Sequence, residues 1–223
     1  EEIGVPTIAD FDADGEPEIG FAADDYYTVL EADGSLKWQH AVEDQSSGFT
    51  GSSVFDFEGD GAAEVVYADE TTLYVFDGAT GAVKLEETGH SSATCTEYPV
   101  IADVDADGEA EIVFVSDFFD GGYEQGITVV GDENRSWMPG RQVWNQHAYS
   151  ITNVDPPGTI PESQETNWLS YNSFRSGDLA SRTGGAYADA VALVDVCEAD
   201  CDEDRVEVVV RVGNGGVAEL PAG

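Results

Sequence analysis

Acidic residues recur in this chain at a spacing that suits a divalent cation. Three segments, 10–18, 56–64 and 103–111, each carry carboxylates at positions 1, 3, 5 and 9 and a glycine at position 6. Calcium accepts six to eight oxygen ligands and tolerates irregular geometry. A short loop can supply these oxygens when alternate carboxylates point inward and the backbone turns sharply after the third. The spacing therefore predicts three calcium-binding loops.

Each loop is expected to offer four carboxylates and the backbone carbonyl of position 7. The predicted ligands are Asp10, Asp12, Asp14, Glu16 and Glu18 in the first loop, Asp56, Glu58, Asp60, Ala62 and Glu64 in the second, and Asp103, Asp105, Asp107, Glu109 and Glu111 in the third. Glycine at position 6 suits a positive φ, which a residue with a Cβ adopts only at a cost. Glu58 replaces the aspartate of the other two loops, and we expect its longer side chain to weaken the second site.

An EF-hand, a magnesium site and a plain hairpin turn each fit the pattern less well than a calcium loop. An EF-hand begins with the same acidic spacing, but its closing glutamate stands at position 12 and helices flank the loop. Magnesium demands a nearly ideal octahedron and keeps its water ligands. A single acidic, glycine-containing segment could be a solvated hairpin turn, but three segments in the same register favour a metal.

The residues around the loops predict β-strands. Segments 18–22, 64–68 and 111–115 begin at position 9 of their loops and are rich in β-branched and aromatic residues. Further strand patterns in 27–38 and 73–85 are interrupted by Asp-Gly turns, which is typical of β-hairpins. No amphipathic helix is predicted in this region, so the expected fold class is all-β.

The loops return after 46 and 47 residues, with about four short strands predicted in each unit. This period is typical of β-propeller blades, here near 5–48, 51–96 and 98–135. Three blades cannot close a ring, because propellers have at least four. Either further blades precede residue 1, or a partner supplies them, or segment 136–177 forms a divergent closing blade.

Segment 136–177 is aromatic, and its aromatic side chains are expected to pack at the blade closure rather than to form a platform for sugars. They are Trp137, Trp144, Tyr149, Trp168, Tyr171 and Phe174. The remainder, 178–223, is predicted to be a glycine- and serine-rich linker followed by strands near 191–196 and 206–212. Two or three strands are too few to fold alone, so we expect part of a second β-sandwich domain.

The formal net charge of −38 excludes a nucleic-acid partner, since phosphate binding requires Lys and Arg and the chain has only eight of them. A highly soluble, self-repelling surface would account for this charge. Adaptation to salty or calcium-rich water would also account for it, and this alternative predicts that the melting temperature depends on salt when calcium is held fixed.

Several features indicate an extracellular or cell-surface location. No run of eighteen apolar residues could span a membrane, and the absence of a signal peptide leads us to expect a processed or excerpted chain. Millimolar calcium is found outside cells. Cys197 and Cys201 could pair across a tight turn, which favours an oxidising compartment. Cys95 is expected to be a buried small residue.

The loops and their flanks resemble the FG-GAP/VCBS-type calcium-binding propeller repeats of bacterial secreted and surface proteins. The shared element is Pro-x-Ile-Ala-Asp-x-Asp-x-Asp-Gly-x-x-Glu-Ile, present in 6–19 and 99–112. The resemblance covers roughly residues 1–177 and implies the same carboxylate ligands, with Glu58 as the departure from the pattern. The glycine-rich ending, from residue 212, resembles the start of a bacterial cell-adhesion-related immunoglobulin-like domain.

Catalysis is not expected. The chain has no G-x-S-x-G nucleophile motif, and His40, His90 and His147 lack the spacing of a metal site. We therefore expect a non-enzymatic, calcium-binding repeat module for adhesion or extracellular assembly, with calcium in a structural role. Its partners would be a protein or glycan surface ligand, or copies of itself. The alternatives are a non-catalytic accessory domain of a secreted polysaccharide-degrading enzyme and a self-assembling structural subunit.

Overall fold

The computed structural model describes residues 3–48, 50–119, 126–155, 158–177, 190–200 and 205–214. Regular structure in these ranges consists of β-strands, apart from one 3-10 turn, η1 (Asn167–Leu169). The prediction of an all-β protein is therefore confirmed. Within the same ranges, no helix is long and apolar enough to cross a membrane.

Three antiparallel sheets follow one another along the chain. The first contains β1 (Thr7–Ala9), β2 (Glu18–Ala22), β3 (Tyr26–Leu30) and β4 (Leu36–Ala41); the second contains β5 (Ser53–Phe55), β6 (Glu64–Ala68), β7 (Leu73–Phe76) and β8 (Val83–Glu87); the third contains β9 (Val100–Ala102), β10 (Glu111–Ser116) and β11 (Gly126–Val130). Strands pair in chain order, so each sheet is a simple meander. The turn glycines Gly34 and Gly81 have φ of 84° and 72°, as the predicted hairpin turns require.

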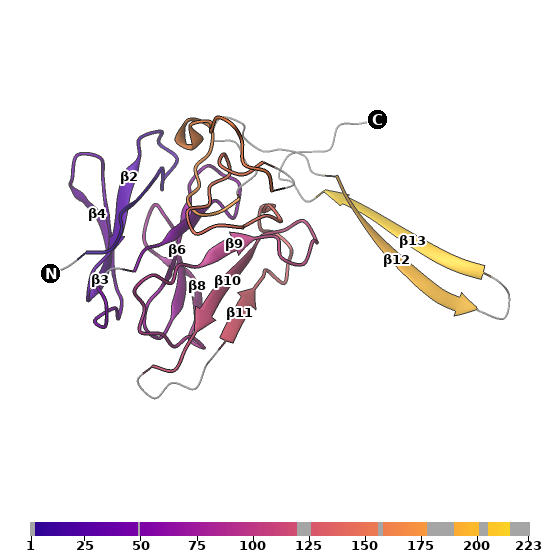
Figure 1. Ribbon diagram of the computed structural model, residues 1–223, viewed down its shortest axis with the longest axis horizontal. Coiled ribbons are helices and arrows are strands. Elements are labelled where there is room, and N and C mark those ends of the chain that lie inside the picture. Colours follow the sequence, from indigo (N-terminus) through magenta and orange to yellow (C-terminus); the bar gives the residue numbers. More distant parts are fainter. Residues whose placement is uncertain are drawn as a thin grey trace.

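The sheets lie face to face, with the second between the other two (Figure 1). One apolar cluster joins the first and second sheets and a separate one joins the second and third. All five residues of β6 are buried, because alternate side chains enter opposite clusters: Val65 and Tyr67 enter one, and Val66 enters the other. The first strands are also neighbours, since β1 contacts β5 and β5 contacts β9.

Segment 131–177 does not form a sheet in its described residues; it contains the η1 turn and isolated bridges. In Figure 1 it runs over one end of the three sheets. Phe174 pairs with Val54 and Ser176 with Ile101, so the segment reaches the first strands of the second and third sheets. Its backbone groups thus bond to existing sheets and loops, and the alternative of a divergent closing blade in 136–177 is not seen there.

The aromatic residues of this segment divide into two groups. Tyr149 is buried, and Trp137 packs against Phe57 with ring centroids 4.6 Å apart, so these two side chains contribute to packing. The prediction is wrong for Trp168, which is 70% exposed because η1 presents it outward.

The cysteine predictions also have different outcomes. Cys95 is exposed, so the prediction of a buried small residue is wrong. Its backbone N–H donates to Thr50 Oγ1 at 3.2 Å in the connection between β8 and β9, with φ at 94°, and its side chain remains outside both apolar clusters. The proposed Cys197–Cys201 pair lies outside the described side chains.

The C-terminal strand prediction is confirmed by β12 (Ala190–Asp200) and β13 (Arg205–Asn214), which form an antiparallel hairpin longer than expected. The linker and the remainder of the predicted immunoglobulin-like domain lie outside the described residues.

Candidate metal centres

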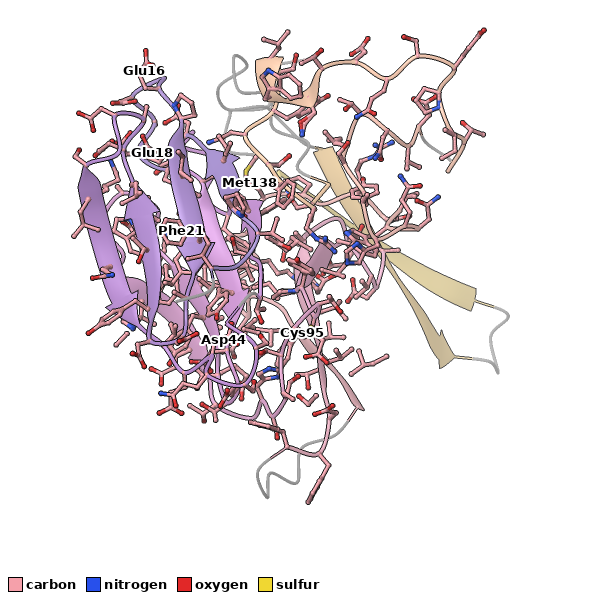
Figure 2. All side chains as sticks on the ribbon, turned by 60° about the vertical axis from the view of Figure 1, so that its left-hand side comes forward. Glu16, Glu18, Phe21, Asp44, Cys95 and Met138 are labelled. Carbon is pink, nitrogen blue, oxygen red and sulfur yellow. The ribbon has the colours of Figure 1, made fainter. Side chains whose placement is uncertain are left out.

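Each predicted loop brings three carboxylates together at positions 1, 3 and 9. The groups are Asp10, Asp12 and Glu18, then Asp56, Glu58 and Glu64, then Asp103, Asp105 and Glu111, and in each group one oxygen per residue lies within 4.8 Å of the others. Figure 2 shows Glu16 and Glu18 of the first loop at the same end of the sheets. Such convergence costs electrostatic energy in the absence of a cation.

The same two hydrogen bonds shape all three loops. The carboxylate at position 1 accepts from the glycine N–H at position 6, at 3.0, 2.8 and 3.2 Å in chain order. The glutamate at position 9 accepts from the N–H at position 2, at 2.6, 3.0 and 2.8 Å. These bonds fix the position-1 and position-9 side chains, which are buried in all three loops.

The residues at positions 5 and 7 are placed differently. Asp14, Asp60 and Asp107 are outside the three-carboxylate groups. Each instead accepts from the N–H of position 7, namely Glu16, Ala62 or Glu109, at 2.8–3.0 Å. The sequence therefore identified the residues that shape the loop, and positions 5 and 7 remain predicted ligands in addition to the three grouped carboxylates.

The backbone supports the glycine prediction and adds a second left-handed residue. Gly15, Gly61 and Gly108 have φ between 92° and 100°. Position 4 is also left-handed, with φ of 61° at Ala13 and 65° at Ala106. Two alanines in this region carry a strain that glycine avoids, so the tight loop is maintained by its hydrogen bonds rather than by glycine alone.

Glu18 offers an oxygen suited to a cation. Its side chain is 1% exposed, and Oε2 accepts the N–H of Phe11. Its Oε1 is buried without a hydrogen-bond partner among the described residues. Burial raises the pKa of Glu18 to about 7, against the opposing effect of the Phe11 bond. A buried carboxylate in this state would gain strongly from a bound cation.

Burial acts on the glutamates of loops two and three in the same direction as on Glu18. Burial raises the pKa of Glu64, and nearby Glu58 raises it further. Burial likewise raises the pKa of Glu111 and that of Glu109, the latter to about 7. Oxygen-only, carboxylate-rich sites of this type fit calcium, and none of the three groups includes the thiolate or imidazole that a softer metal prefers.

Two lysines contact the loops, although the acidic spacing gives no indication of them. Lys37 Nζ lies 2.5 Å from Asp12 Oδ2 and 2.9 Å from Glu31 Oε1. Lys84 Nζ lies 2.6 Å from Glu58 Oε1 and 2.9 Å from Glu64 Oε1. They are the only lysines in the sequence, and that rarity was the available signal.

Segment 131–177 contacts all three loops. Asn172 Nδ2 donates to the carbonyls of Asp10 and Gly61, at 2.6 and 2.9 Å. The Met138 carbonyl accepts from Ala110 N–H in the third loop, and Gln142 Nε2 donates to Asp103 Oδ2 at 3.0 Å. The loops are therefore held between the sheets and this segment.

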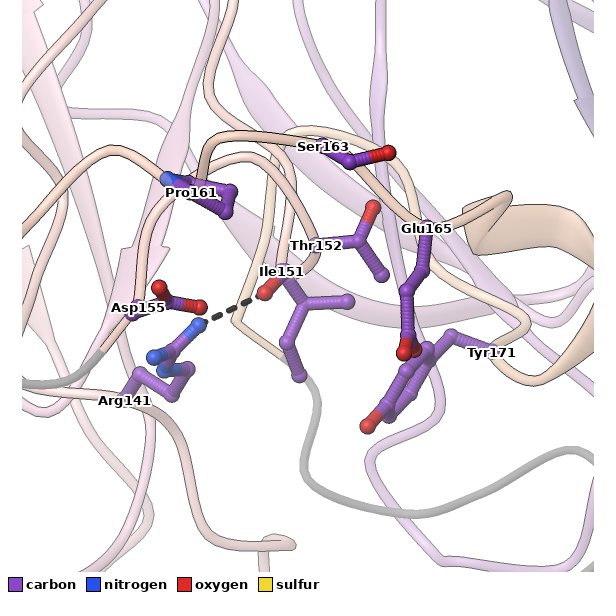
Figure 3. A pocket seen from close by; sticks show the side chains of 8 residues that line it. All are labelled: Arg141, Ile151, Thr152, Asp155, Pro161, Ser163, Glu165 and Tyr171. Carbon is purple, nitrogen blue, oxygen red and sulfur yellow. Dashed lines mark hydrogen bonds between the residues drawn. The ribbon is translucent and has the colours of Figure 1, made fainter.

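A cavity of about 380 Å³ lies within the same segment (Figure 3). Arg141 lines it, but Nη1 donates to the carbonyls of Ile151 and Val154 at 2.7 and 2.8 Å. The guanidinium thus organises the segment's own backbone.

His90 fits a structural role. His90 is buried, Nδ1 lies 3.1 Å from Ser116 Oγ, and its ring packs edge-on against Phe114. The three carboxylate groups are the only candidate metal clusters found among the described side chains, and none contains a histidine.

No protein-family model matches the chain, and no curated protein matches it. Among solved structures, the chain is similar to the crystal structure of the V. cholerae biofilm matrix protein Bap1, with 32% sequence identity and a TM-score of 0.68. The match covers 74% of this chain and 28% of that chain. The chain therefore corresponds to less than a third of the length of that protein.

Proposed function

We propose that this chain belongs to an extracellular matrix or adhesion protein whose β-sheets are stabilised by calcium. The observation that carries the proposal is the threefold recurrence of one carboxylate arrangement, at positions 1, 3 and 9, in the loop that joins the first two strands of each sheet. Similarity to a biofilm matrix protein supports the extracellular role.

Calcium in these loops would be structural. It would neutralise the converging carboxylates in a chain with a formal charge of −38. This would stiffen the loops, because their carboxylates otherwise repel one another. The position-1 and position-9 side chains are buried and already tied to the loop backbone. This arrangement suits a role in holding the loops in shape, and it supports the proposal of a structural, non-enzymatic module.

We further infer that the three sheets are successive blades of a β-propeller of the FG-GAP/VCBS type. Antiparallel meanders stacked face to face, with β1 beside β5 and β5 beside β9, support this inference. Additional blades would come from the longer protein or from a partner.

Calcium binding is tested by titration calorimetry and thermal melting of the purified chain after chelation. We expect heat of binding for calcium, a rise in melting temperature of at least about 10 °C, and a much smaller effect of magnesium at equal concentration. The matched variants D103N and E111Q should reduce this rise, whereas the exposed D33N should not. Unchanged melting with calcium in the wild type would overturn the structural role.

The extracellular role is tested by adding fluorescently labelled protein to bacterial biofilms with and without calcium. Calcium-dependent retention in the matrix, reduced by D103N and E111Q, is the expected result. Equal washing-out of wild type and variants would contradict a matrix or adhesion role.

A self-assembling subunit is the second candidate, because the third sheet has three strands among the described residues where the others have four. Its last strand, β11, exposes Ile127 and Val129 at 72% and 50%. An open edge of this kind can accept a further strand. Light scattering after size exclusion should show oligomers if this candidate is correct and a monomer if it is not.

A further inference from the structure

The two lysines occupy equivalent places in two blades. Lys37 is the second residue of β4 and Lys84 is the second residue of β8. Each is on the fourth strand of its sheet and points an ammonium group at the acidic loop of the same sheet. The third sheet has no fourth strand among the described residues, and correspondingly no lysine reaches the third loop.

In the second loop the ammonium pairs directly with the grouped carboxylates. Lys84 Nζ bridges Glu58 and Glu64, two of the three grouped carboxylates. Glu64 is buried, and its other oxygen accepts the Phe57 N–H. Both oxygens of Glu64 are therefore satisfied without calcium.

In the first loop the neutralisation is partial. Lys37 Nζ contacts Asp12, but its second partner is Glu31, which is outside the grouped carboxylates. Glu18 Oε1 remains buried without a partner among the described residues. A cation-binding oxygen is thus left over in this loop.

In the third loop no ammonium contacts the group within the described part of the chain. The basic side chain nearby, Arg135, is half-exposed and lies 3.3 Å from Asp107, which is at position 5 and outside the three grouped carboxylates. The described contacts leave the carboxylates of Asp105 and Glu111 without an ion pair to Lys or Arg.

We propose that the Lys84 ammonium takes the place of calcium in the second loop and that Lys37 lowers the calcium affinity of the first loop. Stabilisation by calcium would then come mainly from the third loop. This inference rests on the proposed calcium binding and specifies how it is distributed. The ammonium closes the second loop in the absence of calcium and repels an incoming divalent ion. The three repeats of one motif therefore serve different roles.

Titration calorimetry at about 0.15 M NaCl tests the distribution, with wild type, K84M, K37M and R135M. The wild type should bind fewer than three calcium ions tightly. K84M should gain one binding event, K37M should tighten one event at least about tenfold, and R135M should remain within about twofold of wild type. Adding E58Q to K84M should remove the gained event, which assigns it to the second loop.

Melting curves cover the case in which a variant is poorly folded without metal. K84M should melt earlier than wild type in chelator, because its second loop has lost its cation, and calcium should remove this difference. K84R, which keeps the charge, should resemble wild type. If K84M stays unfolded in calcium, or if it gains no binding event, the inference about Lys84 is wrong.

The two proposals fail in distinguishable ways. Three equally tight calcium ions in the wild type, unaffected by K84M and K37M, would overturn the distribution while leaving calcium binding intact. Absence of calcium binding in the wild type and in every variant would overturn the proposed function itself.

Discussion

Asn172 and Asp10, far apart in sequence, form a reciprocal pair of hydrogen bonds. The Asp10 N–H donates to Asn172 Oδ1 at 2.9 Å, and Asn172 Nδ2 donates to the Asp10 carbonyl at 2.6 Å. The same Nδ2 donates to the Gly61 carbonyl at 2.9 Å. One buried amide therefore ties segment 131–177 to position 1 of the first loop and to the turn of the second.

Replacing Asn172 with alanine should lower the free energy of unfolding by about 2–3 kcal/mol, because buried backbone groups of Asp10 and Gly61 would lose their partner. The matched variant N134A removes an exposed amide whose side chain bonds only to Asp132 among the described residues and should leave melting unchanged. Denaturant unfolding in calcium measures both variants. Equal stabilities would show that Asn172 is not a structural tie.

Features held by contacts between residues close in sequence could be predicted from the sequence, whereas contacts between distant segments could not. The position-6 glycines and the hairpins after each loop were predictable because their hydrogen bonds connect residues close in sequence. The Lys84 contact depends on the register that carries the chain from β6 through β7 to β8. The hydrogen bonds of Asn172 form because a distant segment of the chain folds back onto the loops. No local sequence pattern predicts this. The sequence therefore predicted the loops and their sheets, but not the side chains that neutralise and clamp them.

Asp44 is a second buried tie, at the opposite end of the sheets from Glu18 (Figure 2). It is fully buried and accepts from Tyr67 Oη at 2.9 Å and from Thr94 Oγ1 at 2.5 Å. We expect D44A to destabilise the chain by about 3 kcal/mol, since two buried hydroxyls would lose a charged acceptor. Thermal melting with the exposed D33A as control measures the effect. A D44A protein as stable as D33A would contradict this role.

Gly78 is required by close packing rather than by its φ. A Cβ there would lie 2.1 Å from the Ala63 carbonyl and 2.6 Å from the Phe11 carbonyl, in the adjoining loops of two sheets. Both obstacles are backbone atoms, so G78A should cost at least about 3 kcal/mol or prevent folding.

Gly131 provides the matched control for Gly78. The nearest atom to a Cβ there is Glu111 Cγ at 3.6 Å, so G131A should be close to neutral. If chemical denaturation finds G78A and G131A equally stable, the two loops do not approach each other as closely as described.

The metal-free protein should lose stability as pH rises from about 4.5 to 7. Burial raises the pKa of Glu18 to about 7 from an ordinary value of 4.5. In that window the folded chain retains a proton that the unfolded chain has released, so the unfolded state is favoured as protons become scarce. Burial lowers the pKa of His90 and opposes this trend below about 6.5, but the pKa values of Glu64, Glu109 and Glu111 are raised like that of Glu18.

Calcium should reverse this dependence, because it binds the ionised carboxylates and its stabilisation grows as they deprotonate. Melting curves from pH 5 to 8 should therefore slope downward in chelator and upward in calcium. E18Q should flatten the chelator curve without abolishing the calcium effect of the third loop. Parallel curves in chelator and calcium would mean that the buried carboxylates and the metal are not linked.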